Sequence, residues 1–240
     1  MYGWRARFGL LVPSSNTTNE PEFRETLPKG VELYTARLPL DRVGAEELSK
    51  MSETASREAE KLSHANVDVL AYGCTTGSLV NGRGYALELE KTLSKSADAP
   101  AVVTALSVER ALAALGANRI SVVTPYIQEL NELEREFLEA GSVEVENIDG
   151  RGLDQNLEIG ALSQNEAYLH AAEAAEWDVD AVFISCTNYR TFSVIDQLEE
   201  DFGTPVVTSN QATLWDALRQ MRIDSRGIGP GKLFEKARDL

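Results

Sequence analysis

The two cysteines are the residues whose type and placement most directly suggest chemistry. Cys74 and Cys186 are the only cysteines among the 240 residues. Each follows a short apolar run and precedes small polar residues expected to begin a helix, CTTGS at 74–78 and CTNYR at 186–190. Unpaired N–H groups at a helix start lower the pKa of a thiol and bind carboxylates. Two facing thiols could attack, deprotonate or reprotonate a small substrate from opposite sides.

A repeat in the chain favours this chemical interpretation, although a lone buried cysteine near a strand end is often only a packing residue. VDVLAYGCTT at 67–76 aligns with VDAVFISCTN at 179–188, and the offset of 112 residues pairs the two cysteines. The same offset pairs Pro13 with Pro125. A third pair of similar segments follows in the same order. The chain is therefore predicted to consist of two duplicated halves.

Each half alternates short apolar runs with segments of helical spacing. The runs are 8–12, 67–72, 101–104, 120–124, 181–185 and 206–208. They lack polar alternation, which is typical of strands buried on both faces. The pattern predicts an α/β fold with two pseudo-symmetric, doubly wound, flavodoxin-like domains, parallel sheets and an active-site cleft between the domains. The glycine-containing segments 82–84 and 150–152 are expected in loops, as is Asn156.

Charge and composition exclude several classes of partner. The net charge of −15 argues against nucleic acid, and no run of about 18 apolar residues predicts a membrane span. The first residues lack a secretory pattern, so a cytoplasmic protein is expected. Two histidines and no CxxC pair predict no metal site. The 7 lysines against 16 arginines are compatible with a halophilic source and with an ordinary acidic enzyme.

Several polar residues could bind a substrate anion, and each has a structural alternative. The loop at 12–20 is dense in hydroxyls and amides, which could bind a carboxylate or merely cap a helix. Tyr126 could donate to an oxyanion or pack in the core. Arg190 could pair with a carboxylate or form a surface salt bridge. Asn156, taken alone, is an ordinary turn residue.

Four motifs together resemble the aspartate/glutamate racemase superfamily. They are VPSSNTT at 12–18, YGCTTGS at 72–78, VVTPY at 122–126 and SCTNYRT at 185–191. The resemblance is strongest to the branch with maleate cis-trans isomerases, arylmalonate decarboxylases and an ectoine-utilisation protein. Amino-acid racemases of the superfamily carry a histidine where this chain has Asn188. Arylmalonate decarboxylase has glycine at the position of Cys74.

The resemblance implies a two-cysteine isomerase acting on a small dicarboxylate, most simply converting maleate to fumarate. Cys74 would be the nucleophile and Cys186 the acid and base. Asn16, Tyr126 and Asn156 would hold the carboxylates, and Thr75 and Thr187 would add donors beside the thiols. No cofactor would be needed.

The resemblance also implies an assembly and a division into lobes. Relatives are commonly dimers, so a homodimer or larger homo-oligomer is expected. The last helix of relatives crosses back to the first lobe. Residues 1–100 and 210–240 would therefore form an N-terminal lobe that carries Cys74, and residues 101–209 a C-terminal lobe that carries Cys186.

Two alternatives remain open at this point. One is a racemase or decarboxylase of a related acid, such as an ectoine-pathway derivative or a substituted malonate. The other is a carboxylate-binding module without catalysis, because two lobes around a cleft also occur in solute-binding proteins.

Overall fold

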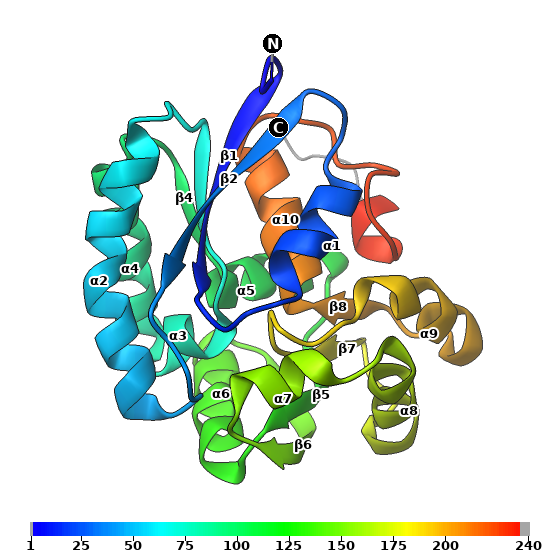
Figure 1. Cartoon of the computed structure of the whole chain (residues 1–240). Coiled ribbons are helices and arrows are strands. Elements are labelled where there is room, and N and C mark those ends of the chain that lie inside the picture. The colour runs from blue at the N-terminus through cyan, green and yellow to red at the C-terminus, as the bar shows by residue number, and fades with distance from the viewer. Residues whose placement is uncertain (1, 236–240) are drawn as a thin grey trace.

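Two four-stranded parallel sheets form the framework of the chain (Figure 1). The computed structural model describes residues 2–235, so residues 236–240, assigned above to the N-terminal lobe, lie outside the described part. The first sheet has the order β2-β1-β3-β4 and the second the order β6-β5-β7-β8. This confirms the predicted α/β fold. Each sheet has the strand order of flavodoxin without its fifth strand, and the matching orders agree with a duplicated chain.

The strands of both sheets follow the duplicated pattern. Their bounds are β1 (Ala6–Pro13), β2 (Val31–Leu38), β3 (Val69–Tyr72), β4 (Ala101–Val103), β5 (Arg119–Tyr126), β6 (Glu144–Leu153), β7 (Ala181–Ile184) and β8 (Val206–Thr208). The six strands other than β2 and β6 coincide with the apolar runs. The prediction missed β2 and β6, which are edge strands. Strands β4 and β8 also lie at sheet edges but are fully buried, whereas β2 and β6 are partly exposed and need no continuous apolar run.

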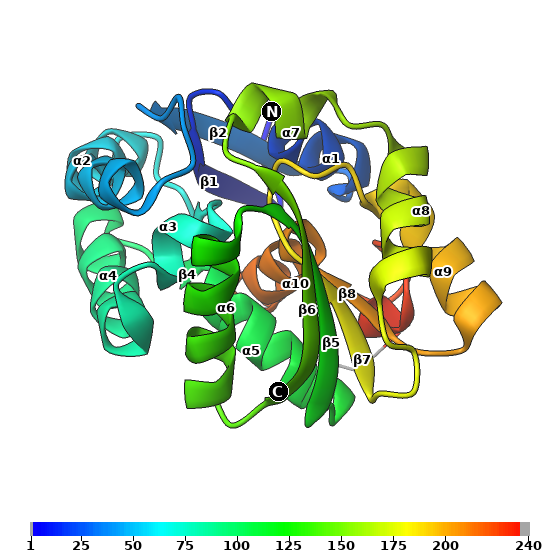
Figure 2. The same ribbon diagram turned by 90° about the horizontal axis from the view of Figure 1, so that it is seen from below.

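Helices cover both faces of each sheet. Their bounds are α1 (Asn19–Thr26), α2 (Ala45–Ser63), α3 (Thr75–Leu79), α4 (Gly82–Ala97), α5 (Thr104–Leu115), α6 (Gln128–Ala140), α7 (Asn156–Ala161), α8 (Gln164–Ala174), α9 (Ile195–Phe202) and α10 (Ser209–Gln220). Two short 3₁₀ helices, η1 (Phe192–Val194) and η2 (Lys232–Glu235), complete the description. In the first lobe α2 and α4 cover one face and α1 and α10 the other (Figure 1). In the second lobe α5 and α6 lie opposite α8 and α9 (Figure 2).

Three loop predictions are wrong. Gly82 and Gly84 lie in α4, whereas Gly150 and Gly152 lie in β6. Asn156 is the first residue of α7 and is buried. Glycine marks a loop only where the backbone needs its freedom, and the Gly84 position has ordinary helical geometry.

The two lobes exchange their last helices. Helix α5 follows β4 of the first sheet and contacts β8, and α10 follows β8 and contacts β3 and β4. The two helices pack against each other between the sheets (Figure 2). Strand β4 pairs with β3, so it belongs to the first sheet, although the predicted boundary at residue 100 assigns it to the second lobe. We therefore propose a division of the lobes after Val103.

Candidate active site

A small cavity, called here the central cavity, lies between the lobes at the carboxyl ends of β1, β3, β5 and β7. It is lined by Pro13, Asn16, Leu40, Val43, Cys74, Thr75, Thr76, Tyr126, Asn156, Cys186 and Thr187. All seven site residues that the resemblance implies are in this lining. Its volume of about 10 Å³ accommodates about one water molecule. Each lobe contributes one of the two cysteines.

Cys74 ends the loop after β3 and is the N-cap residue of α3. Its backbone is extended, with φ of −147°. The Gly77 N–H donates to the Cys74 Sγ at 3.4 Å, as expected for a residue that caps a helix. Burial nevertheless raises the pKa of the Cys74 thiol to about 11, because loss of hydration outweighs this hydrogen bond.

Cys186 follows β7 in a different backbone conformation. Its φ of +97° lies in the left-handed region, which residues other than glycine rarely adopt. The expectation that a helix starts directly after it is wrong, because a turn leads to η1 at Phe192–Val194. The Asn188 N–H donates to the Cys186 Sγ at 3.3 Å. Burial raises the pKa of this thiol to about 12, although a hydrogen bond with Tyr126 lowers it.

The two thiols are therefore protonated at neutral pH in this closed site, contrary to the expected lowering of their pKa. The predicted N–H donors are present, but burial is the larger effect at both residues. A thiolate at Cys74 raises the pKa of the Cys186 thiol further. The pair thus favours one thiolate with one thiol over two thiolates.

Asn16 combines helix capping with a place in the central cavity. Its Oδ1 accepts the N–H groups of Thr18 and Asn19, each at 2.9 Å, at the start of α1. Its Nδ2 donates to the Thr187 Oγ1 at 3.2 Å. The two alternatives drawn from the sequence, capping and binding, are therefore compatible, because they use opposite ends of the same amide.

The remaining polar lining residues are tied across the lobe boundary. The Asn156 Nδ2 donates to the Ser15 Oγ at 2.8 Å. The Thr187 Oγ1 donates to the Gly73 carbonyl at 3.1 Å. The Tyr126 side chain is buried, which raises the pKa of its phenol well above the ordinary value, so it is a neutral hydrogen-bond donor. These groups form a neutral polar lining suited to an anion.

Arg190 does not reach the central cavity. It is exposed and lines a separate surface hollow of about 370 Å³ together with Glu22. The Glu22 carboxylate accepts from the N–H groups of Thr191 and Phe192 at 2.9 and 3.1 Å and from Asn210 at 2.6 Å. Burial raises the pKa of Glu22 to about 7. This carboxylate holds the Cys186 loop against α1.

Glu134 is a titratable residue near the cavity that the sequence reasoning missed. It lies on α6, and the Ser185 Oγ donates to its Oε1 at 2.6 Å. Burial raises the pKa of its carboxyl to about 8, and its charge raises the pKa of Tyr126 and of Cys186. A signal was present, because Glu134 falls on the apolar stripe of Leu130 and Phe137, where a charged residue is unusual.

Neither a metal site nor a membrane-spanning helix is found among the described residues. Between residues 2 and 235, no group of three or more His, Cys, Asp or Glu side chains is placed to hold a metal ion. No helix in that range is long and apolar enough to cross a bilayer.

Comparison with known proteins shows to which family this chain is related. The sequence matches the family described as arylmalonate decarboxylase over residues 8–234. The maleate isomerase of Pseudomonas putida is 31% identical over 96% of this chain and 98% of that protein. The arylmalonate decarboxylase of Bordetella bronchiseptica is 26% identical over 95% of this chain and 96% of that protein.

A solved structure agrees with the sequence relatives. A variant of the maleate isomerase Iso from Pseudomonas putida S16, crystallised with maleate, superposes with a TM-score of 0.92 at 28% identity. The superposition covers 97% of this chain and 98% of that one, so both lobes and their exchanged helices are shared. With a family match over nearly the whole chain and the same two-lobed architecture, this chain belongs to the arylmalonate decarboxylase family.

Proposed function

We propose that this protein is a two-cysteine cis-trans isomerase of a small dicarboxylate, most simply converting maleate to fumarate. The observation that carries the proposal is that Cys74 and Cys186 line one cavity from two different lobes. The similarity to maleate isomerases over nearly the whole chain supports the same reaction. A cavity without a charged lining side chain also suits a reaction whose proton is kept between two thiols.

The proposed reaction uses one thiolate and one thiol. The Cys74 thiol first gives its proton to water while the site is open. Its thiolate then adds to one olefinic carbon of the cis diacid, and the Cys186 thiol gives its proton to the neighbouring carbon. The product is a succinyl thioether with a C–C single bond, which can rotate. Cys186, now a thiolate, removes a proton from the same carbon, and the Cys74 thiolate leaves. Fumarate is released, and the two sulfurs regain the protonation states that they had before the addition.

The assignment of roles follows the surroundings of each thiol. The Cys74 Sγ accepts the Gly77 N–H at the start of α3, which suits a nucleophilic thiolate, and burial keeps the Cys186 thiol protonated, which suits the acid. We further propose that Asn16, Tyr126 and Asn156 bind the substrate carboxylates through N–H and O–H donors. Thr75 and Thr187 would add donors beside the thiols.

The site must open to admit a dicarboxylate. A cavity of about 10 Å³ cannot hold a four-carbon diacid. Leu40 and Val43 cover it from the loop between β2 and α2. That loop is fastened to the second lobe, because the Val43 N–H donates to the Asp154 carbonyl at 2.8 Å and Arg42 forms an ion pair with the Asp154 side chain. Access therefore requires this loop to move.

The test is direct. Incubation with maleate, followed by proton NMR, should show fumarate without any added cofactor. Cys74→Ser and Cys186→Ser should each lower kcat by about 10⁴-fold or more, as expected when one member of a catalytic pair is removed. Near-full activity of either variant would refute the two-thiol mechanism.

A second candidate, decarboxylation of a substituted malonate, is favoured by the match to arylmalonate decarboxylase. The same NMR experiment with phenylmalonate would show phenylacetate. A decarboxylase would release carbon dioxide with Cys74→Ser still active, whereas the isomerase proposal requires both thiols.

Two properties expected from the sequence remain proposals. We propose a homodimer or larger homo-oligomer, which light scattering of the purified protein would test. We also propose a cytoplasmic location, for which fractionation of the source cells is the measurement.

A further inference from the structure

Ser209 occupies an unusual position between the two cysteine segments. It is the first residue of α10, the helix that crosses from the second lobe onto the first, and it is fully buried. Its Oγ accepts from the Thr75 Oγ1 at 2.8 Å and from the Cys186 N–H at 3.0 Å. Thr75 follows Cys74 directly in the chain. One hydroxyl oxygen is thus bonded to the segments that carry both thiols.

The backbone of Cys186 needs such support. A residue with a side chain at φ of +97° is strained, and strain of this kind persists only where surrounding contacts fix it. The first turn of α10 supplies two of these contacts. Besides the Ser209 bond to the Cys186 N–H, the Asn210 Nδ2 donates to the Thr187 carbonyl at 3.0 Å. Two neighbouring residues of one helix therefore bind the backbone at Cys186 itself and at the residue that follows it.

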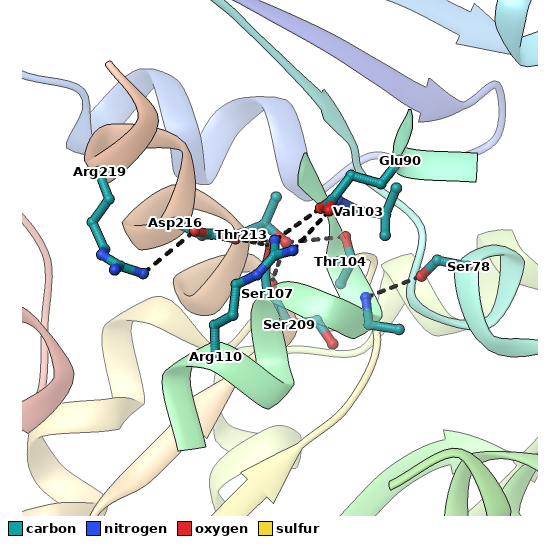
Figure 3. A network of polar contacts seen from close by, with 11 residues as sticks. Ser78, Glu90, Val103, Thr104, Ser107, Arg110, Ser209, Thr213, Asp216 and Arg219 are labelled. Atoms are coloured by element: carbon teal, nitrogen blue, oxygen red, sulfur yellow. Dashed lines mark hydrogen bonds and ion pairs between the residues drawn. The ribbon is translucent and has the colours of Figure 1, made fainter. Parts of the chain in front are cut away.

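Helix α10 is held to its neighbours by an ion pair and hydrogen bonds, which fix the position of Ser209. In Figure 3 the Arg110 guanidinium lies between Glu90 and Asp216, with N–O distances of 2.7 Å to each. The Thr213 Oγ1 bonds to the Thr104 Oγ1 at 3.0 Å, which joins α10 to α5. These contacts hold α10 by its middle, one to two turns beyond Ser209. The hydroxyl is thereby positioned relative to both lobes.

We propose that Ser209 is a positioning residue for both thiols, which sets the separation and orientation of Cys74 and Cys186 across the central cavity. The proposal rests on the proposed two-thiol reaction for its effect on turnover. Its geometric part stands without that reaction, because the hydroxyl is bonded to both segments in any case. Since the sulfurs must reach adjacent carbons of one substrate, a small shift of either segment would slow the chemical step more than it weakens binding.

Ser209→Ala removes the shared acceptor. Ser121→Ala is the matched control, since it removes another fully buried serine hydroxyl that accepts a backbone N–H, from Glu176 at 2.9 Å, near the start of β5 and away from the central cavity. Ser209→Gly provides a second hydroxyl-free variant if alanine prevents folding, and Ser209→Thr keeps the hydroxyl. With maleate, Ser209→Ala should lower kcat by about 10- to 100-fold and change KM by less than about threefold. Ser121→Ala should retain kcat within about twofold, and Ser209→Thr should recover most of the loss.

A second readout does not depend on the reaction. The rates at which iodoacetamide alkylates Cys74 and Cys186 are measured separately by peptide mass spectrometry across pH 7–10, with circular dichroism as a check on folding. Ser209→Ala should change the ratio of the two rates by at least about threefold, because the strained Cys186 segment relaxes. Ser121→Ala should leave that ratio unchanged.

The two readouts separate the two proposals. Absence of maleate turnover in the wild-type protein, with an altered alkylation ratio in Ser209→Ala, would refute the proposed function and retain the positioning role. The positioning role is refuted if Ser209→Ala keeps both kcat and the alkylation ratio within twofold of wild type. It is equally refuted if Ser121→Ala loses as much as Ser209→Ala.

Discussion

The buried carboxyl of Glu134 permits a quantitative prediction about pH and stability. This side chain is 1% exposed, and its Oε2 has no hydrogen-bond partner within residues 2–235. Burial raises the pKa of its carboxyl from 4.5 to about 8. At neutral pH Glu134 is therefore protonated in the folded protein and ionised in the unfolded chain. Glu134→Gln keeps the shape of the side chain and its Oε1 acceptor for Ser185 but cannot titrate.

The sign follows from proton binding. A carboxyl whose pKa is raised by folding binds more protons in the folded state, so its contribution to the free energy of unfolding is largest below pH 4.5. That contribution is lost as the pH rises towards 8, by about 1.4 kcal/mol per pH unit. Between pH 5 and pH 8 the loss from Glu134 amounts to roughly 3 to 4 kcal/mol. Other titrating groups, such as Glu22, are the same in both proteins and cancel in the comparison.

The assay is urea unfolding of wild type and Glu134→Gln at pH 5, 6.5 and 8. The amide of the variant places an N–H group where Oε2 lies, and an unpaired buried N–H costs about 1 to 3 kcal/mol at every pH. The variant therefore starts less stable at pH 5 and gains on the wild type by roughly 3 kcal/mol at pH 8. The slope, not the offset, is the diagnostic quantity. Parallel stability curves would show that Glu134 ionises normally and would refute the argument.

Three further predictions concern reactivity, access and charge. Iodoacetamide should alkylate both thiols slowly, with both rates still rising at pH 9, because burial raises the thiol pKa values to about 11 and 12; a rate that levels off below pH 9 for either thiol, seen by peptide mass spectrometry, would contradict this. Arg42→Gln should loosen the loop bound to Asp154 and change KM for maleate by up to about fivefold, as expected for an exposed ion pair; an unchanged KM and kcat would show that the pair does not control access. The chain has a net charge of −15 and maleate is a dianion, so salt should weaken their repulsion. We therefore expect kcat/KM to rise by about two- to tenfold between 0.05 and 1 M NaCl. A flat or falling curve in steady-state kinetics would contradict long-range repulsion.

The sequence predicted those parts of the fold that are buried uniformly. The central strands β1, β3, β5 and β7 are covered on both faces, so their apolar runs are continuous and visible. Strands β2 and β6 carry mixed polar and apolar residues because they are partly exposed, whereas the other two edge strands, β4 and β8, are fully buried. Strands β2 and β6 form because they pair with a neighbouring strand. The identity of that neighbour cannot be read from the residues of the strand itself.

The residues of the candidate site also fall into those that the sequence could predict and those that it could not. The residues that follow strands directly, such as Cys74 and Tyr126, could be placed because parallel strands all end at one edge of a sheet. Leu40, Val43 and Ser209 could not, since each reaches the site through a loop or helix that crosses from elsewhere. The raised pKa of both thiols was also hidden, because burial is a collective result of packing and not a property of the residues next to a cysteine.

The duplicated architecture explains how one chain can present two similar groups with different tasks. The repeat places each cysteine after the third strand of its sheet, so both thiols meet between the lobes. The local surroundings then differ. Cys74 caps a short helix with an extended backbone, whereas Cys186 is strained and bonded to Tyr126. Because one thiolate raises the pKa of the other thiol, the loss of a second proton from the pair is disfavoured. Symmetry thus supplies the opposed sulfurs, and under the proposed mechanism the departures from symmetry give them different tasks.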